Sequence, residues 1–490
     1  MLFPTTVFAL FFAVVFALHW GLAGYPRLRK LTLLCSSLFF YGYWSWKFAL
    51  MLLGSALLNH AAAMSMDAAR DQHARRRIIA LAVVGNLLVL AFFKYTGFFF
   101  TRMLVPLAVP LCSWLGTTEQ LINLQEQILP FIERIVLPVG ISFYTFQALS
   151  YVVDVYWRKT PVAGSVLDFA NYLAFFPQLV AGPIVRAVDL LPQMAVFPDR
   201  KTRIDTGRAA TLILGGLFKK MVVANWLAEH LADPVFAMPE SYAGPDIVLG
   251  VYAYAIQIYC DFSAYSDIAI GCALLLGFHF PINFYAPYFS VTLQEFWRRW
   301  HISLSTWLRD YLYIPLGGSK AGAARTRVNL FLTFLLGGLW HGAGWTFVLW
   351  GAYHGAYLSL ERVVRRLFGL PEKPSEQTPL VLAMLGRVWI FQVVCLSWVL
   401  FRAQNLYSAG ELLRSLFRWD GESVLFSVAA VTMLAVGFLL QFLDGMRPRR
   451  IWDVVNRWPV WVQGAVAAVI LTVILGIGPS GVAPFIYFQF

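Results

Sequence analysis

The chain has 490 residues, of which 59% are hydrophobic and only 13% are charged. Soluble globular proteins carry about 25% charged residues, so the composition excludes a soluble class and indicates a protein solvated by the lipid bilayer. The net charge of +12 arises from basic clusters between apolar segments, as the positive-inside rule requires, and this excludes a nucleic-acid binder with a basic soluble module.

Apolar segments recur along the chain, and a spanning helix needs about 20 apolar residues. They predict an all-α, polytopic membrane protein with about 11–12 transmembrane helices. Several of these segments are short, and residues 31–66 could instead form a broken pair of helices. The predicted spans are 2–20, 31–46, 48–66, 78–100, 128–156, 207–230, 246–276, 328–345, 346–363, 380–402, 425–443 and 459–478.

The basic residues also predict an orientation. The first apolar segment lacks a basic n-region and its positive charges follow it, so we expect a retained helix with a periplasmic N-terminus rather than a cleaved signal peptide. Threading the spans from there puts 29 of the 38 Lys and Arg residues in seven cytoplasmic connections. We therefore expect a multi-pass protein of the bacterial inner membrane.

The predicted organisation is a single membrane domain in three parts: N-terminal helices (1–156), a catalytic core (157–363) and C-terminal helices (380–490). Within the core, two prolines and a glycine make a straight helix unfavourable in 168–190, so this segment is predicted to be re-entrant or irregular. Its Gly182-Pro183 is expected to form a cavity wall. Segment 101–127 is expected to be partly helical and interfacial.

The five cysteines are scattered singly, without CxxC spacing, and predict neither a disulfide framework nor a metal site.

Residues 295–313 are predicted to form an interfacial amphipathic helix, with aromatic residues on one arc and charged residues on the other. His301 falls at the edge of the apolar arc, either as a functional group or as a satisfied interfacial histidine. Arg298, Arg299 and Arg309 could neutralise the phosphates of an acyl-CoA donor, although binding of lipid headgroups explains them equally well.

A histidine inside an apolar segment is the strongest candidate for a catalytic group. His341 lies 13 residues into the predicted helix, about 20 Å deep at 1.5 Å per residue. Ionisable side chains inside membranes are costly and indicate function, and the neighbouring glycines allow backbone or substrate to approach closely. Glycine-mediated packing without catalysis is the alternative. His354 is predicted to be structural, with hydrogen bonds across helices.

Two carboxylates, Asp261 and Asp267, lie in one apolar segment and must be paired or hydrogen-bonded. They could orient a histidine, as a carboxylate does in nucleophilic triads, or fix helix packing, which is slightly favoured. Lys219 and Lys220 could be their partners or could extend to the interface; donor binding is a further possible role.

These segments together resemble the membrane-bound O-acyltransferase superfamily over nearly the whole chain, and most closely its bacterial polysaccharide branch, typified by the membrane subunit of alginate O-acetylation. Residue 264 is Ala where that branch leads us to expect Gly, which removes no chemical group. The matching motifs are FFYGYW at 39–44, LPVGISFY at 137–144, FPQLVAGP at 176–183, DFSAYSD at 261–267, residues 296–313, LWHG at 339–342 and FIYFQF at 485–490.

The resemblance implies a ring of helices around a central tunnel that holds the histidine. His341 then corresponds to the essential histidine and His301 to a second one nearer the cytoplasm, with Trp340 as a supporting residue. It also implies acetyl-CoA as donor without a bound cofactor, a polysaccharide acceptor, and a relay through a periplasmic SGNH/GDSL-like acetyltransferase partner.

Two other functions remain open at this stage. A transporter or flippase of an acyl donor would use the histidines as a proton relay, but the repeated halves common in transporters are not seen. An enzyme of the same fold could instead acylate a lipid or a protein. The sequence does not name the polysaccharide.

Overall fold

The computed structural model describes the chain except residues 200, 321, 370–378, 447–448, 478–484 and 487–490, and describes only the backbone of residues 449–451. Within the described residues every regular element is a helix and no strand occurs. The predicted all-α class is therefore confirmed.

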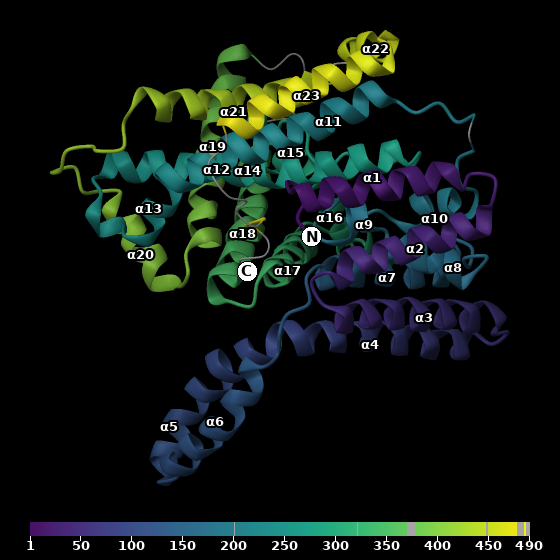
Figure 1. Ribbon diagram of the computed structural model, residues 1–490. Coiled ribbons are helices and arrows are strands. Elements are labelled where there is room, and N and C mark those ends of the chain that lie inside the picture. Colours follow the sequence, from purple (N-terminus) through teal and green to yellow (C-terminus); the bar gives the residue numbers. More distant parts are fainter. Residues whose placement is uncertain (200, 321, 370–378, 447–448, 478–484, 487–490) are drawn as a thin grey trace.

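The N-terminal helices form a layer from which one hairpin projects (Figure 1). Helices α3 and α4 pack along each other, and α4 continues through a π-helical turn, η1, into α5. The α5–α6 hairpin extends away from the rest of the molecule (Figure 1). Segment 101–127, predicted to be partly helical, is helical apart from residues 116–117, and its interfacial position stays a prediction. The elements are α1 (Thr6–Gly21), α2 (Pro26–Gly42), α3 (Trp46–Ala68), α4 (Gln72–Phe99), η1 (Phe100–Leu104), α5 (Val105–Leu115), α6 (Thr118–Glu133) and α7 (Ile141–Tyr156).

The prediction of one span over 128–156 is wrong. Helix α6 ends at Glu133 and α7 begins only at Ile141. Gly140 adopts a φ of 74°, which a residue with a side chain rarely tolerates. A Cβ on Gly140 would also lie 3.3 Å from the Cα of Val180. The chain is therefore interrupted here by a turn packed against another segment.

The core is built around α14, the most deeply buried of the long apolar helices. It packs against α11, α19, α21 and the π-helical turns η2 and η3. The core elements are α8 (Val166–Ala174), α9 (Phe176–Leu179), α10 (Ala187–Ala195), α11 (Thr206–Phe218), η2 (Lys219–Ala224), α12 (Asn225–Leu227), η3 (Ala228–Ala232), α13 (Asp233–Ala237), η4 (Pro239–Ser241), α14 (Gly244–Leu275), η5 (Pro287–Phe289), α15 (Leu293–Arg299), α16 (Ile302–Leu308), η6 (Arg309–Tyr313), α17 (Gly322–His341) and α18 (Trp345–Leu367).

Segment 168–190 is irregular, as predicted. Phe175 separates the short helices α8 and α9, and a non-helical stretch over 180–186 separates α9 from α10. Every residue from 168 to 185 is buried. A Cβ on Gly182 would lie only 2.5 Å from the Cα of Gln178, so the tight turn requires glycine. Protein surrounds this backbone, which is the condition for irregular structure at membrane depth.

The C-terminal helices cover α14 and α11. Helix α19 has the bounds predicted for the span 380–402. The helices are α19 (Leu380–Arg402), α20 (Leu406–Ser415), α21 (Val428–Met446), α22 (Arg449–Arg457) and α23 (Val460–Ile477).

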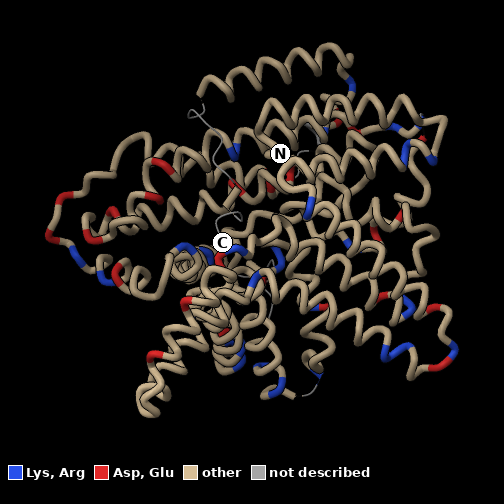
Figure 2. The backbone as a smooth tube through the Cα atoms, turned by 60° about the horizontal axis from the view of Figure 1, so that its bottom comes forward, with Lys and Arg blue, Asp and Glu red and all other residues tan. Residues whose placement is uncertain are grey.

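Seven helices of the described part are long and apolar enough to span a membrane, and Lys and Arg are concentrated at helix ends and connections (Figure 2). The other five predicted spans correspond to α1, α2, the interrupted α6–α7 segment, α17 and α18, which are shorter, broken or more polar. The seven are Trp46–Ala68, Gln72–Leu115, Thr206–Ala237, Gly244–Leu275, Leu380–Arg402, Val428–Met446 and Val460–Ile477.

Candidate active site

His341 is the last residue of α17 and is 6% exposed. The chain leaves the helix at 342–344 and returns as α18, which packs along α17. A Cβ on Gly338 would lie 3.0 Å from the backbone nitrogen of Gly351, so the two helices approach through bare backbone. The predicted span 328–345 therefore ends four residues too late, because α17 stops at His341 and the glycines of this segment form a tight hairpin.

The imidazole of His341 is surrounded by aromatic rings. Its centroid lies 5.0 Å from Trp340, 5.0 Å from Trp350 and 5.2 Å from Phe401. All three contacts are edge-type, with interplanar angles between 73° and 82°, which is a favoured geometry for aromatic pairs. Trp340, for which a supporting role is predicted, is one of these rings; the role itself stays a prediction.

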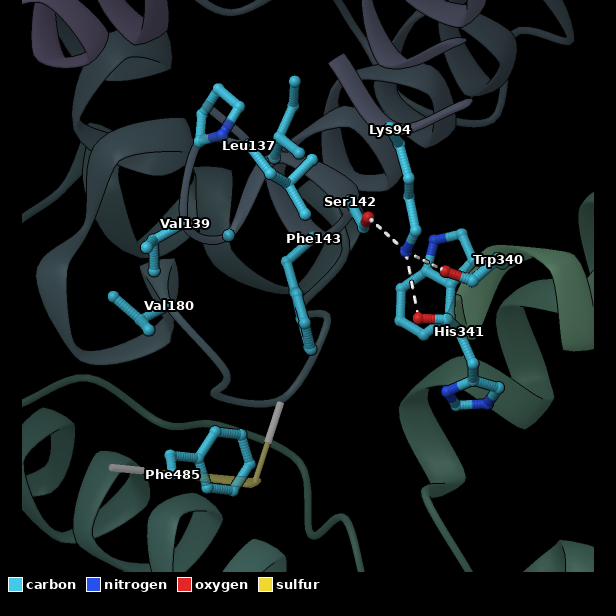
Figure 3. Close-up of a pocket in the computed structure, with 12 residues that line it drawn as sticks. Lys94, Leu137, Val139, Ser142, Phe143, Val180, Trp340, His341 and Phe485 are labelled. Atoms are coloured by element: carbon cyan, nitrogen blue, oxygen red, sulfur yellow. Dashed lines mark hydrogen bonds between the residues drawn. The ribbon is translucent and has the colours of Figure 1, made fainter. Parts of the chain in front are cut away.

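A cavity of about 180 Å³ adjoins His341. Its wall brings together segments that are distant in the sequence (Figure 3). Val180 of the irregular segment lines the cavity. Gly182 and Pro183 do not line it, contrary to the prediction. The lining residues are Lys94, Leu137, Pro138, Val139, Gly140, Ile141, Ser142, Phe143, Val180, Trp340, His341 and Phe485.

His301 lies at a break between α15 and α16, so the prediction of one continuous helix over 295–313 is wrong. Its φ of 41° is left-handed. The backbone N–H groups of Ile302 and Ser303 donate to the carbonyl oxygen (2.9 Å) and the side-chain Oδ1 (3.1 Å) of Asn283. These hydrogen bonds to Asn283, which lies in the loop before α15, take the place of intrahelical bonds. The helix predicted over 295–313 is therefore interrupted between Arg299 and Ile302.

The His301 side chain is fully buried. Its Nδ1 lies 3.2 Å from Asn283 Oδ1, an acceptor, so the ring donates there and the neutral form carries its lone pair on Nε2. Nε2 has no hydrogen-bond partner among the described residues. The His301 ring lies 6.3 Å from Trp340, so the same indole contacts both histidines.

His354 is fully buried, but the predicted hydrogen bonds across helices are not formed within the described part of the chain. Its ring packs instead against Trp350 at 4.7 Å and Trp297 at 5.1 Å. Trp350 thus separates His354 from His341.

The buried carboxylates pair with the lysines rather than with a histidine. Lys220 Nζ lies 2.5 Å from Asp261, and Lys219 bonds to Asp267 and, at 2.9 Å, to Asp444. Helix packing, the favoured alternative, is what these contacts provide. Donor binding by Lys219 and Lys220 is not supported, because both charges face carboxylates in the interior.

The predicted donor-binding arginines have different surroundings. Arg299 donates to Glu295 at 2.6 Å, and Arg309 donates to Asp310 at 2.6 Å. Arg298 is exposed and forms no ion pair with any described residue. Of the three, Arg298 alone presents an uncompensated charge to a ligand.

Several known proteins are similar to this chain. A sequence model of the membrane-bound O-acyltransferase family matches residues 161–401. The probable alginate O-acetylase of Pseudomonas aeruginosa is 42% identical over 421 residues, which cover 85% of this chain and 75% of that protein. The chain belongs to the membrane-bound O-acyltransferase family.

Other relatives agree. The probable alginate O-acetylase of Pseudomonas putida is 38% identical and the match covers 100% of both chains. The peptidoglycan O-acetyltransferase of Helicobacter pylori is 36% identical, over 86% of this chain and 80% of that protein. The sequence resemblance is thereby confirmed: this membrane-bound O-acyltransferase is a multi-pass membrane enzyme.

Two features of this membrane-bound O-acyltransferase were missed in the sequence. Lys94 on α4 lines the cavity beside His341. Lys94 could have been singled out from the sequence, because a lysine inside the apolar segment 78–100 is as unusual as Lys219 in 207–230. The second is a cavity of about 290 Å³ at the other end of α18, lined by Gln294, Leu358, Glu361, Arg362, Arg365, Arg366 and Gly369.

Proposed function

We propose that this enzyme acetylates a polysaccharide exported across the bacterial inner membrane, with His341 as the catalytic base. The observation that carries the proposal is the burial of His341 at the end of α17, in the wall of a cavity of about 180 Å³. The names of the relatives support the acceptor class, because they specify alginate and peptidoglycan.

In the proposed reaction, His341 removes the proton of an acceptor hydroxyl while the hydroxyl oxygen attacks the carbonyl carbon of an acetyl thioester. The new C–O bond forms and the C–S bond breaks. The imidazolium then returns its proton to the leaving thiolate, so that the base is restored. His301 offers a second acceptor, Nε2, within the same aromatic layer.

The proposed donor is acetyl-CoA from the cytoplasm, entering beside the 296–313 segment. Arg298 and the arginines of the 290 Å³ cavity can bind its phosphates, because guanidinium groups match phosphate oxygens in geometry and charge. Along α18, Arg362 lies 12 residues beyond Trp350, about 18 Å at 1.5 Å per residue. A pantetheine arm has a comparable reach and would bring the thioester toward His341.

The proposed acceptor approaches from the periplasmic side, the side on which we also propose the N-terminus to lie. It is either the polysaccharide itself or a residue of a periplasmic SGNH/GDSL-like acetyltransferase that completes the transfer. The relay is favoured by the small cavity, about 180 Å³, which suits an acetyl group and one hydroxyl better than a polymer.

The test is a His341→Ala variant expressed from the native locus of the host. We expect ester-linked acetate on the exported polymer to disappear while the variant remains in the membrane at normal abundance. His73→Ala serves as the matched control, since the His73 side chain is 82% exposed. Normal acetylation in a fully inserted His341→Ala variant would refute the proposal. Donor uptake into vesicles without ester formation would favour a transporter.

A further inference from the structure

Two neighbouring side chains of α4, Lys94 and Tyr95, hold the end of the helix that carries His341. The Tyr95 hydroxyl donates to the carbonyl oxygen of Leu339 at 2.7 Å. The Lys94 ammonium donates to the carbonyl oxygens of Trp340 and, at 3.1 Å, of His341 (Figure 3). Three successive carbonyls of α17 are therefore bonded from one side by α4.

These carbonyls are the ones that a helix cannot satisfy by itself. The last four C=O groups of an α-helix have no donor within the helix, and α17 ends at His341. The negative end of the helix dipole lies there too, and a cation at that end is stabilising. Lys94 and Tyr95 supply the missing donors and the positive charge together.

The contacts of Lys94 are concentrated at the end of α17. Lys94 forms no ion pair with any described residue, although the other two lysines within the predicted spanning segments, Lys219 and Lys220, face carboxylates. Its remaining contacts are also part of the cavity: Nζ lies 3.4 Å from Ser142 Oγ and 5.7 Å from the centroid of Trp340. A lysine inside an apolar helix is energetically costly, and all the hydrogen bonds that its ammonium forms with the described residues lie at the candidate active site.

We propose that Lys94 is a positioning residue for acyl transfer: together with Tyr95 it fixes the last turn of α17 and so holds the imidazole of His341 in the cavity. The proposal rests on the proposed role of His341 as the base. Because His341 is the terminal residue of α17, loosening of this turn displaces the imidazole directly, whereas residues earlier in the helix remain held by its own hydrogen bonds.

The experiment compares Lys94→Met, Lys94→Arg, Tyr95→Phe and wild type in inverted membrane vesicles of the host. Radiolabelled acetyl-CoA is the donor, and label in the polysaccharide is measured. For Lys94→Met we expect the maximal rate to fall by about 100-fold, the size of effect known for a displacement near 1 Å. The half-saturating acetyl-CoA concentration should stay within about threefold, because ground-state binding is retained.

Lys94→Arg, which restores charge and donors, should recover most of the rate, and Tyr95→Phe, which removes one bond, should have a smaller effect. Lys47→Met is the matched control, because Lys47 is exposed. Hydrogen–deuterium exchange of the purified variants should show faster exchange in Lys94→Met at residues 336–344 and unchanged exchange in α14.

A full maximal rate in Lys94→Met would overturn the proposal. Faster exchange throughout α4, α7 and α14 without recovery in Lys94→Arg would also overturn it, since Lys94 would then be merely structural. His341→Ala separates the two hypotheses. If this variant is inactive while Lys94→Met is normal, only the positioning role fails; if it is active, the proposed function itself fails.

Discussion

The side-chain amide of Asn283 organises the break between α15 and α16, and replacing it leaves both histidines unmutated. Its amide makes four side-chain hydrogen bonds: to Ser266 Oγ at 3.0 Å, from Ser303 N at 3.1 Å, from Ser303 Oγ at 2.9 Å and from His301 Nδ1 at 3.2 Å. With each bond contributing about 1 kcal/mol, Asn283→Ala should lower the free energy of unfolding by about 4 kcal/mol.

The loss should also reach the chemistry. Without Asn283 the His301 ring loses the acceptor that the described residues provide for its Nδ1 proton, and the break between α15 and α16 loses a side-chain bond that defines it. We therefore expect a large decrease in acetyl transfer per folded molecule.

Unfolding of the purified enzyme in mixed micelles, followed by tryptophan fluorescence, measures the stability, and the vesicle assay measures the transfer. Ser266→Ala is the control, because it removes one of the four bonds and should destabilise by about 1 kcal/mol. If Asn283→Ala were no less stable than Ser266→Ala, the assignment of this amide as the organising centre of the break would be refuted.

Two further predictions follow from packing. Gly351→Ala should destabilise the enzyme by about 1–3 kcal/mol, as overpacking does, because the new Cβ would lie 3.0 Å from the Cα of Leu335. Thermal unfolding in detergent measures the change, and Gly85→Ala is the control because a Cβ there meets nothing within 4 Å. His354→Phe should change the free energy of unfolding by less than about 1.5 kcal/mol and retain acetyl transfer. The reason is that His354 is enclosed by aromatic rings and lacks hydrogen-bond partners among the described residues. Loss of transfer in a stable variant would show that the ring nitrogens of His354 are needed.

The helices that the sequence predicted well are those whose signal is local. Span 380–402 coincides with α19, and 459–478 nearly coincides with α23, because uninterrupted apolar composition is sufficient to define such helices. The histidine in the LWHG motif could be singled out for a similar reason, since an ionisable residue among apolar neighbours is recognisable from the sequence alone.

Other features depended on distant partners. The break at His301 arises from Asn283, 18 residues earlier, and the amphipathic pattern over 295–313 carries no trace of it. The lysine–carboxylate pairs could be anticipated only as alternatives, because Asp444 lies 225 residues from Lys219. Lys94 had the same local signal as Lys219, but its partners are backbone carbonyls, which sequence composition does not reveal.

The pairing of Lys219 has a consequence for biogenesis. A lysine at the centre of a spanning helix opposes insertion by about 2.5–3.5 kcal/mol, and two stand together between Thr206 and Ala237. The first carboxylates that pair with these lysines, Asp261 and Asp267, are synthesised as part of α14. We therefore expect the segment to enter the bilayer together with α14 as a helical hairpin. Asp444 is synthesised much later and bonds to the same ammonium, so we expect the second ion pair of Lys219 to form only once α21 has been inserted.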